Sequence, residues 1–233
     1  MTLTRSPWLI AAGTIVLGGM LLAAAAAARW LPCLTGSEQV CLARQSHAYD
    51  YIVPIEPAQP LAITSVLAGL GMIMVAVSWP FIVGQLKIKR RLAVALLVIM
   101  ITKAGLVGLL TLSAAVAGGL PAAATGPLFI GEIVLDLAVL GVVLVTPNER
   151  VADYQRLLLA AGPVWLVGTV GRVIDGAFFT LANPGPEVPP GSGCLTAAII
   201  VGCGIGIAAI TRNEVPRRRS VRTERSASES TSP

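Results

Sequence analysis

The feature that most constrains this chain is a series of apolar stretches, each about as long as a lipid bilayer is thick. A hydrocarbon core of about 30 Å needs roughly 20 helical residues. Six such stretches, separated by charges or by Pro and Gly clusters, run from Trp8 to Trp30, Leu61 to Gly84, Leu92 to Gly119, Leu128 to Thr146, Leu157 to Leu181 and Leu195 to Thr211. The pattern predicts an all-α integral membrane protein with a bundle of about six transmembrane helices in residues 1–212.

The low charge content excludes an ordinary soluble domain. Only 12% of the residues are charged, whereas soluble domains carry about 25%. The basic excess, 17 Lys and Arg against 12 Asp and Glu, lies mostly in short clusters between the apolar stretches. This distribution is typical of membrane orientation rather than of nucleic-acid binding, so we expect membrane lipids and no nucleic acid as partners.

The basic residues predict which ends of the helices face the cytoplasm. Positive charge is enriched in cytoplasmic loops, and Arg29 and Arg44 are the two cations of the opposite side. The cytoplasmic set is Arg5, Lys87, Lys89, Arg90, Arg91, Arg150, Arg156, Arg212, Arg217, Arg218, Arg219, Arg222 and Arg225. We therefore predict a multi-pass protein of the cell (plasma) membrane with both termini cytoplasmic. Four tryptophans near helix ends are expected to be interfacial anchors, namely Trp8, Trp30, Trp79 and Trp165.

Two terminal segments carry their own expectations. Arg5 followed by an apolar stretch ending in small residues also fits a cleaved signal peptide, although the stretch exceeds the usual apolar core of such peptides. Cleavage would leave five spans with the loops on the same sides. At the other end, residues 213–233 alternate Arg with Ser, Thr and Glu, which predicts a disordered basic cytoplasmic tail.

The outer loop at 31–60 holds two cysteines that predict a disulfide. Cys33 and Cys41 are separated by seven residues and lie on the side that is oxidising in most cells. Two reduced thiols, or pairing of either cysteine with Cys194, are the alternatives. Cys-x-x-Cys pairs are absent from the sequence, which argues against redox catalysis.

The same loop continues with aromatic and polar residues. Tyr49, Asp50 and Tyr51 form a candidate surface for a partner protein. His47 and Asp50 are too few to make a metal site. We therefore predict a structured outer cap, with no metal and no cofactor.

Five ionisable residues fall inside the apolar stretches. They are Lys103, Glu132, Asp136, Arg172 and Asp175. A charge at the bilayer centre costs about 2.5–3.5 kcal/mol, so these side chains are expected to face one another. At about 1.5 Å of rise per residue, Lys103, Asp136 and Arg172 share one level, with Glu132 and Asp175 one layer closer to the outer surface. Glu132 and Asp136 are four residues apart and lie on the same face of one helix. Arg172 and Asp175 are three residues apart and can pair with each other on another helix.

The charge cluster supports two interpretations. A structural ion-pair network would fix the packing of the third, fourth and fifth spans. A functional site would move protons or bind an ion or a ligand headgroup. Two sets of glycines are expected to allow close helix approach. They are Gly202-x-x-x-Gly206 in the last span and the glycines at 162, 168, 171 and 176 in the fifth.

Sequence motifs for common enzymes are missing. A phosphate-binding glycine loop, a His-rich zinc pattern and a Gly-x-Ser-x-Gly elbow are all absent. The single histidine removes most acid–base schemes. We expect no enzyme; an intramembrane enzyme that uses only carboxylates is the alternative.

The layout resembles that of small actinobacterial membrane proteins. The likeness consists of Ala- and Gly-rich helices, Trp30-Leu31-Pro32-Cys33 with Cys41 directly after the first helix, the stretch from His47 to Pro57, and the basic tail. Among these, the chain looks most like the accessory membrane subunit of mycobacterial Mce lipid importers. The Trp-x-x-Cys motif is also similar to the first outer loop of claudin-type proteins, which have four spans rather than six.

The resemblance implies a non-catalytic role, and it transfers no site residues. We therefore expect an accessory or scaffold subunit of a cell-envelope complex, such as one for lipid or fatty-acid import, with other membrane subunits as partners. The alternative function is a small proton- or ion-coupled transporter that uses the charge cluster.

Overall fold

Every described element in the structure, a computed structural model, is a helix. The described residues are 6–36, 38–45, 50, 52–54, 62–121, 123, 125–146, 151–182 and 191–229. The helices are α1 (Ser6–Thr35), α2 (Glu38–Arg44), α3 (Ala62–Val83), α4 (Arg90–Ala117), α5 (Thr125–Val145), α6 (Val151–Leu166), α7 (Thr169–Ala182) and α8 (Cys194–Glu229). Within these residues, α1, α3, α4, α5 and the first 20 residues of α8 are each long and apolar enough to cross a membrane. The predicted all-helical membrane bundle is confirmed at this level, and the chain is a multi-pass membrane protein.

The predicted fifth span is not a single straight helix. Residues 157–181 fall on α6 and α7, which meet at a short break and are bent by 80°. Gly168 lies in the break with a φ of 122°, a left-handed conformation that favours glycine. The count of spans therefore reaches six only if this bent pair is counted as one span.

One half of the bundle is tightly packed. Helices α8, α1, α3 and α4 pack in series, each extensively against the next. Their backbones approach closely because glycines face each other: a Cβ added at Gly71 would lie 2.7 Å from the Gly18 carbonyl oxygen, and one at Gly108 would lie 2.9 Å from the Gly69 carbonyl oxygen. Since lipid is as apolar as the helices, such close packing is what holds spans together.

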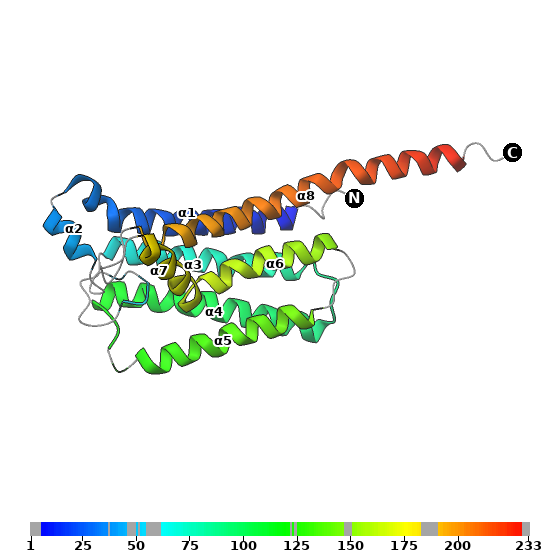
Figure 1. The fold of residues 1–233 in the computed structure, drawn as a ribbon. Helices are drawn as coiled ribbons and strands as arrows, with labels where there is room; N and C mark the ends of the chain where they lie inside the picture. Colours follow the sequence, from blue (N-terminus) through cyan, green and yellow to red (C-terminus); the bar gives the residue numbers. More distant parts are fainter. Residues whose placement is uncertain are drawn as a thin grey trace.

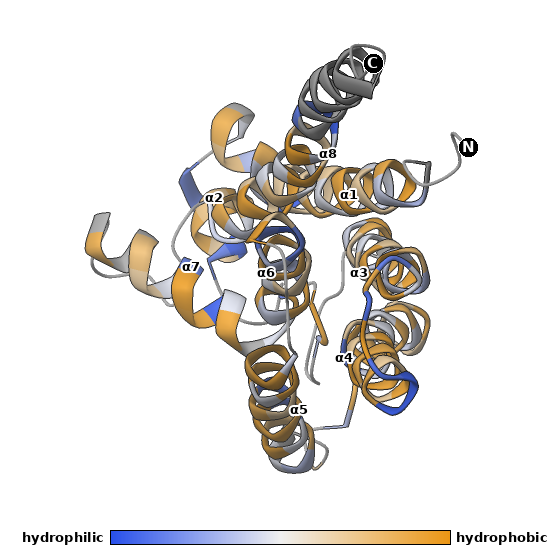
Figure 2. Ribbon diagram, turned by 90° about the vertical axis from the view of Figure 1, so that its right-hand side faces the viewer, coloured by the Kyte–Doolittle hydropathy of each residue, from blue (hydrophilic) through white to orange (hydrophobic). Residues whose placement is uncertain are grey.

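The other half of the bundle is loose. Only 22% of the α5 span is buried inside the protein, against 50% of the α3 span. Figure 2 looks along the bundle and shows α5 at its edge, with apolar residues along the helix. Many of these are exposed, among them Phe129, Ile130, Val134, Leu137 and Leu144. In a bilayer such side chains face lipid or another protein.

The two chain termini lie at the same end of the bundle (Figure 1). The turn between α3 and α4 lies at that end too, whereas α2 and α7 lie toward the opposite end. This arrangement agrees with the even number of crossings that the sequence predicts, with the bent α6–α7 pair as one crossing.

The last helix is longer than its apolar part. Helix α8 is drawn to Glu229, whereas its membrane-length apolar stretch ends at Asn213. The expectation of a disordered basic tail at 213–233 stays a prediction.

The tryptophans also differ from expectation. Trp79 is fully buried, and Trp8 and Trp30 are only 5% and 6% exposed. The Trp8 ring lies 5.3 Å from the Arg156 guanidinium carbon, which is a cation–π distance. In these three positions the large ring packs within the protein rather than at a lipid interface.

Candidate functional site

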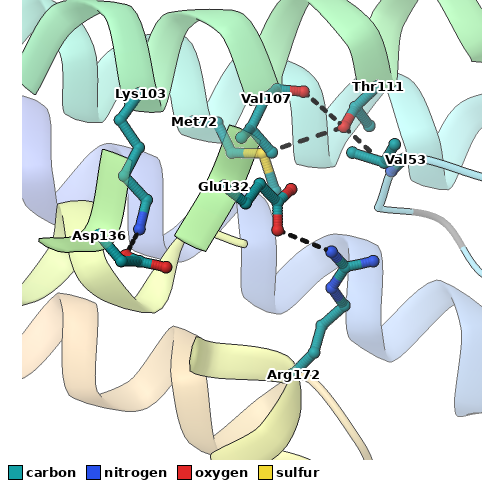
Figure 3. Close-up of polar contacts among 8 residues, drawn as sticks. All are labelled: Val53, Met72, Lys103, Val107, Thr111, Glu132, Asp136 and Arg172. Atoms are coloured by element: carbon teal, nitrogen blue, oxygen red, sulfur yellow. Dashed lines mark hydrogen bonds and ion pairs between the residues drawn. The ribbon is translucent and has the colours of Figure 1, made fainter. Parts of the chain in front are cut away.

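The most deeply buried part of the charge cluster is an ion pair between α4 and α5. Lys103 on α4 is fully buried, and its Nζ pairs with Oδ1 of Asp136 on α5 (Figure 3). The Asp136 side chain is 11% exposed. A buried lysine is tolerated because the carboxylate compensates its charge. This pair links the loose α5 to the tight half of the bundle.

A second ion pair lies one turn away on α5. Oε2 of Glu132 accepts a hydrogen bond of 3.0 Å from Nη2 of Arg172, in the first turn of α7 (Figure 3). The Glu132 side chain is 9% exposed, whereas that of Arg172 is 42% exposed. The Glu132 charge also acts on Lys103. Glu132 therefore connects the buried pair to a half-exposed cation.

The break between α6 and α7 lies directly against this carboxylate. A Cβ added at Gly168 would be 3.3 Å from Oε2 of Glu132, and one at Gly171 would be 1.9 Å from the Leu166 carbonyl oxygen. Glycine is therefore required at both positions, by the close approach and by the sharp turn. The indole nitrogen of Trp165 donates a hydrogen bond of 3.0 Å to the Asp136 carbonyl oxygen, which fixes the end of α6 against α5.

Asp175, on α7, takes no part in the two ion pairs and bonds to the start of α8. Its Oδ2 accepts hydrogen bonds from the Thr196 backbone nitrogen at 3.2 Å and from the Thr196 hydroxyl. Carboxylates are favoured at helix N-termini because the first backbone N–H groups have no partner within the helix. Asp175, which is 4% exposed, thus ties α7 to α8.

The structure joins four of the five predicted residues in two ion pairs, and it joins Asp175 to Thr196 instead. The membrane depths estimated from the helical rise placed Arg172 level with Lys103 and Asp136. In the structure, however, Arg172 bonds Glu132, which was expected one layer closer to the outer surface. The cause is the 80° bend, since a constant rise per residue holds only along a straight helix.

Of the predicted packing glycines, Gly162 and Gly206 face side chains of another helix: a Cβ added at Gly162 would be 3.6 Å from Cys203 Sγ, and one at Gly206 would be 3.0 Å from Leu159 Cδ1. Nothing lies within 4 Å of a Cβ added at Gly176 or Gly202.

Sequence reasoning missed three residues of the site. Gly168 and Gly171 form the break rather than a packing surface, and Thr196 binds the Asp175 carboxylate. The sequence signal for the break was the density of glycines between Pro163 and Gly176. Nothing in the sequence distinguished Thr196 from other threonines.

The outer loop packs back onto the bundle. Nη1 of Arg29 donates to Oδ1 of Asp50 at 2.8 Å. Asp50, one of the three residues of the predicted partner surface, therefore forms an ion pair within the protein. Tyr49 and Tyr51 lie outside the described residues. The indole of Trp30 donates to the Ser192 carbonyl oxygen at 2.9 Å and joins the end of α1 to the start of α8.

The loop cysteines lie at the end of α1 and within α2. The sulfur atoms of Cys33 and Cys41 are at disulfide-bonding distance, with their Cα atoms 4.5 Å apart. Cys194 and Cys203 are not paired. In the described part of the chain, no group of three or more His, Cys, Asp or Glu side chains is arranged to hold a metal ion.

Comparison with known proteins yields no match: no protein-family model, no curated protein and no solved structure matches this chain.

Proposed function

We propose that the chain is a small proton- or ion-coupled membrane transporter that works through the charge cluster. The observation that carries this proposal is the coincidence of the cluster with the break between α6 and α7, where Gly168 lies against Glu132. Irregular backbone at membrane depth is tolerated where it is buried in protein or lines a watery cavity. Discontinuous helices beside charged residues are typical of ion and substrate sites in transporters.

The charge balance of the cluster supports the same proposal. Lys103 and Arg172 supply two positive charges, and Glu132, Asp136 and Asp175 supply three negative charges. Fully ionised, the set carries one excess negative charge. One proton or one monovalent cation would neutralise it, which is favourable because net charge inside a bilayer is costly. The cluster is thus suited to take up and release one positive charge.

The uneven packing of the bundle would allow α5 to move relative to the tightly packed helices. The tight half comprises α1, α3, α4 and α8, and α5 contacts its neighbours far less. Both ion pairs join α5 to other helices. Alternating access commonly proceeds by rocking of one group of helices against another. Breaking and remaking the two ion pairs would couple such rocking to the charge of the cluster.

We further propose that the protein lies in the cell membrane with cytoplasmic termini. Support comes from the turn between α3 and α4, which lies at the same end as both termini. This turn contains Lys87 and Lys89, and Arg90 and Arg91 follow it. Basic residues of this kind remain cytoplasmic. The Cys33–Cys41 pair then lies on the outer, oxidising side, where a disulfide is stable.

A second candidate is an accessory or scaffold subunit of a cell-envelope complex, such as a lipid importer. The observation that favours it is the weak burial of α5, whose exposed apolar side chains a partner subunit could cover. This candidate needs no flux through the chain itself and predicts that a larger complex is isolated with the protein.

Reconstitution separates the two candidates. The purified protein alone, in liposomes carrying a pH-sensitive dye, should dissipate an imposed proton or Na⁺ gradient faster than protein-free liposomes. A flat trace for both gradients, together with co-purification of stoichiometric partners in gentle detergent, would reject the transporter and favour the accessory subunit.

A further inference from the structure

Helix α7 has the side-chain pattern of a helix that lies on a membrane surface. Ile174, Phe178 and Leu181 repeat at spacings of four and three residues and are 40%, 53% and 87% exposed. At 100° per residue, Arg172 projects from the opposite side of the helix. An exposed apolar stripe opposite a cation is typical of interfacial helices.

The direction of α7 fits that role. It is bent by 80° from α6, and Figure 2, which looks along the bundle, shows α7 running outward from the other helices. A helix in this direction runs nearly parallel to the membrane plane when α6 runs across the membrane.

The depth of α7 is fixed by its contacts with α8. The Thr196 hydroxyl donates to the Asp175 carboxylate and also lies 3.4 Å from the Gly171 carbonyl oxygen, one helical turn earlier on α7. Thr196 is the third residue of a 20-residue span, Cys194–Asn213, and so lies about 3 Å inside the outer end of that span. Interfacial helices lie about 5–10 Å into the boundary between headgroups and acyl chains.

Arg172 is positioned to meet a lipid headgroup. Its side chain is 42% exposed on a helix whose other exposed side chains include Val173, Ile174 and Phe178. A guanidinium carries five N–H donors and binds phosphate in a planar, two-point geometry. The exposed Arg172 side chain therefore has the chemistry that a lipid phosphate requires. A lipid phosphate is the anion available at this depth.

We propose that α7 lies in the plane of the outer leaflet, with its apolar stripe among the acyl chains, and that Arg172 binds the headgroup of an anionic phospholipid. This inference concerns a lipid site and goes beyond the proposed transport. Its tests measure depth and lipid binding rather than flux, so it stands or fails separately.

Depth measurements with spin labels test the orientation. Single labels are placed at 174 and 181 in a background lacking Cys194 and Cys203, in nanodiscs of phosphatidylcholine and phosphatidylglycerol. The seven-residue separation corresponds to about 10 Å along a helix, which an 80° bend reduces to about 2 Å in depth. Labels at 137 and 144 on α5, equally spaced and exposed, should differ by about 10 Å. A depth difference of about 10 Å on α7 as well would overturn the proposal.

Native mass spectrometry with added phosphatidylglycerol tests the headgroup contact. Arg172→Gln should bind this lipid about fivefold more weakly, which corresponds to about 1 kcal/mol per cation near a membrane. Arg172→Lys, which keeps the charge, should retain most of the binding. The double variant Glu132→Gln/Arg172→Gln should be weakened like Arg172→Gln, because the loss comes from the missing cation and not from an unpaired carboxylate. Unchanged affinity in Arg172→Gln would refute the headgroup site.

Discussion

Removing one partner of the ion pair between Lys103 and Asp136 is predicted to lower the free energy of unfolding by several kcal/mol, whereas removing both partners is not. Lys103 is fully buried, so the variant Asp136→Leu leaves an ammonium group inside the bundle without its carboxylate. Removing one partner of a buried ion pair costs about 3–5 kcal/mol. Because Glu132 lies one turn from Asp136 on α5 and leaves a second carboxylate nearby (Figure 3), we expect the lower end of that range, about 3 kcal/mol.

Replacing both partners should cost far less. In Lys103→Met/Asp136→Leu, apolar side chains of similar size fill the same space and no charge is left buried. Such replacements are often neutral or stabilising. We therefore expect the double variant to lie within about 1 kcal/mol of the wild type, which makes the coupling energy between the two sites strongly non-additive.

The assay is unfolding in mixed micelles, with the free energy of unfolding measured for the wild type, both single variants and the double variant. Asp153→Asn is the control. It removes the carboxylate of the ion pair between Asp153 and Arg156, and the Asp153 side chain is 28% exposed. It should cost less than Asp136→Leu. Additive single effects, or a loss below about 1 kcal/mol in Asp136→Leu, would show that the pair is not buried as described.

Three further predictions follow from the break, the helix contact and the cysteines. Gly168→Ala should lower the unfolding free energy by about 1–3 kcal/mol, because its φ of 122° is strained for alanine. Gly176→Ala should not, since nothing lies within 4 Å of its Cβ position. Thr196→Val should cost about 1–3 kcal/mol, measured the same way, because Asp175 loses a buried hydroxyl donor; recovery in Thr196→Ser checks the cause. Thiol labelling of the unfolded, unreduced protein should modify two cysteines in the wild type and three in Cys33→Ser. Labelling of all four cysteines in the wild type would refute the disulfide.

Span positions were predictable from the sequence because bilayer thickness sets the length of apolar runs. The second span was predicted at 61–84, and α3 covers Ala62–Val83. The fourth was predicted at 128–146, and α5 covers Thr125–Val145. Hydropathy does not, however, predict where a helix bends. Residues 157–181 are continuously apolar enough for one span, and the bend at Gly168 depends on a backbone conformation that hydropathy ignores.

The partners of the five intramembrane charges were predictable only in part. Intramembrane charges must find partners, so Lys103 and Asp136 were expected to be close, and they form an ion pair. The partners of Arg172 and Asp175 depend on where α7 points, which follows from the break. Trp79 could not be assigned from the sequence either. A tryptophan near the end of a span is compatible with an interfacial anchor and with the core, and Trp79 lies in the core.

The flux of the Lys103→Met/Asp136→Leu variant tests the proposed function most directly. This variant is expected to fold, so a loss of activity cannot be assigned to loss of structure. In liposomes with equal amounts of reconstituted protein, the wild type and Asp153→Asn should dissipate an imposed proton or Na⁺ gradient, whereas the double variant should match protein-free liposomes. Wild-type flux in the double variant would contradict a transport role for this pair and leave it as a purely structural contact between α4 and α5.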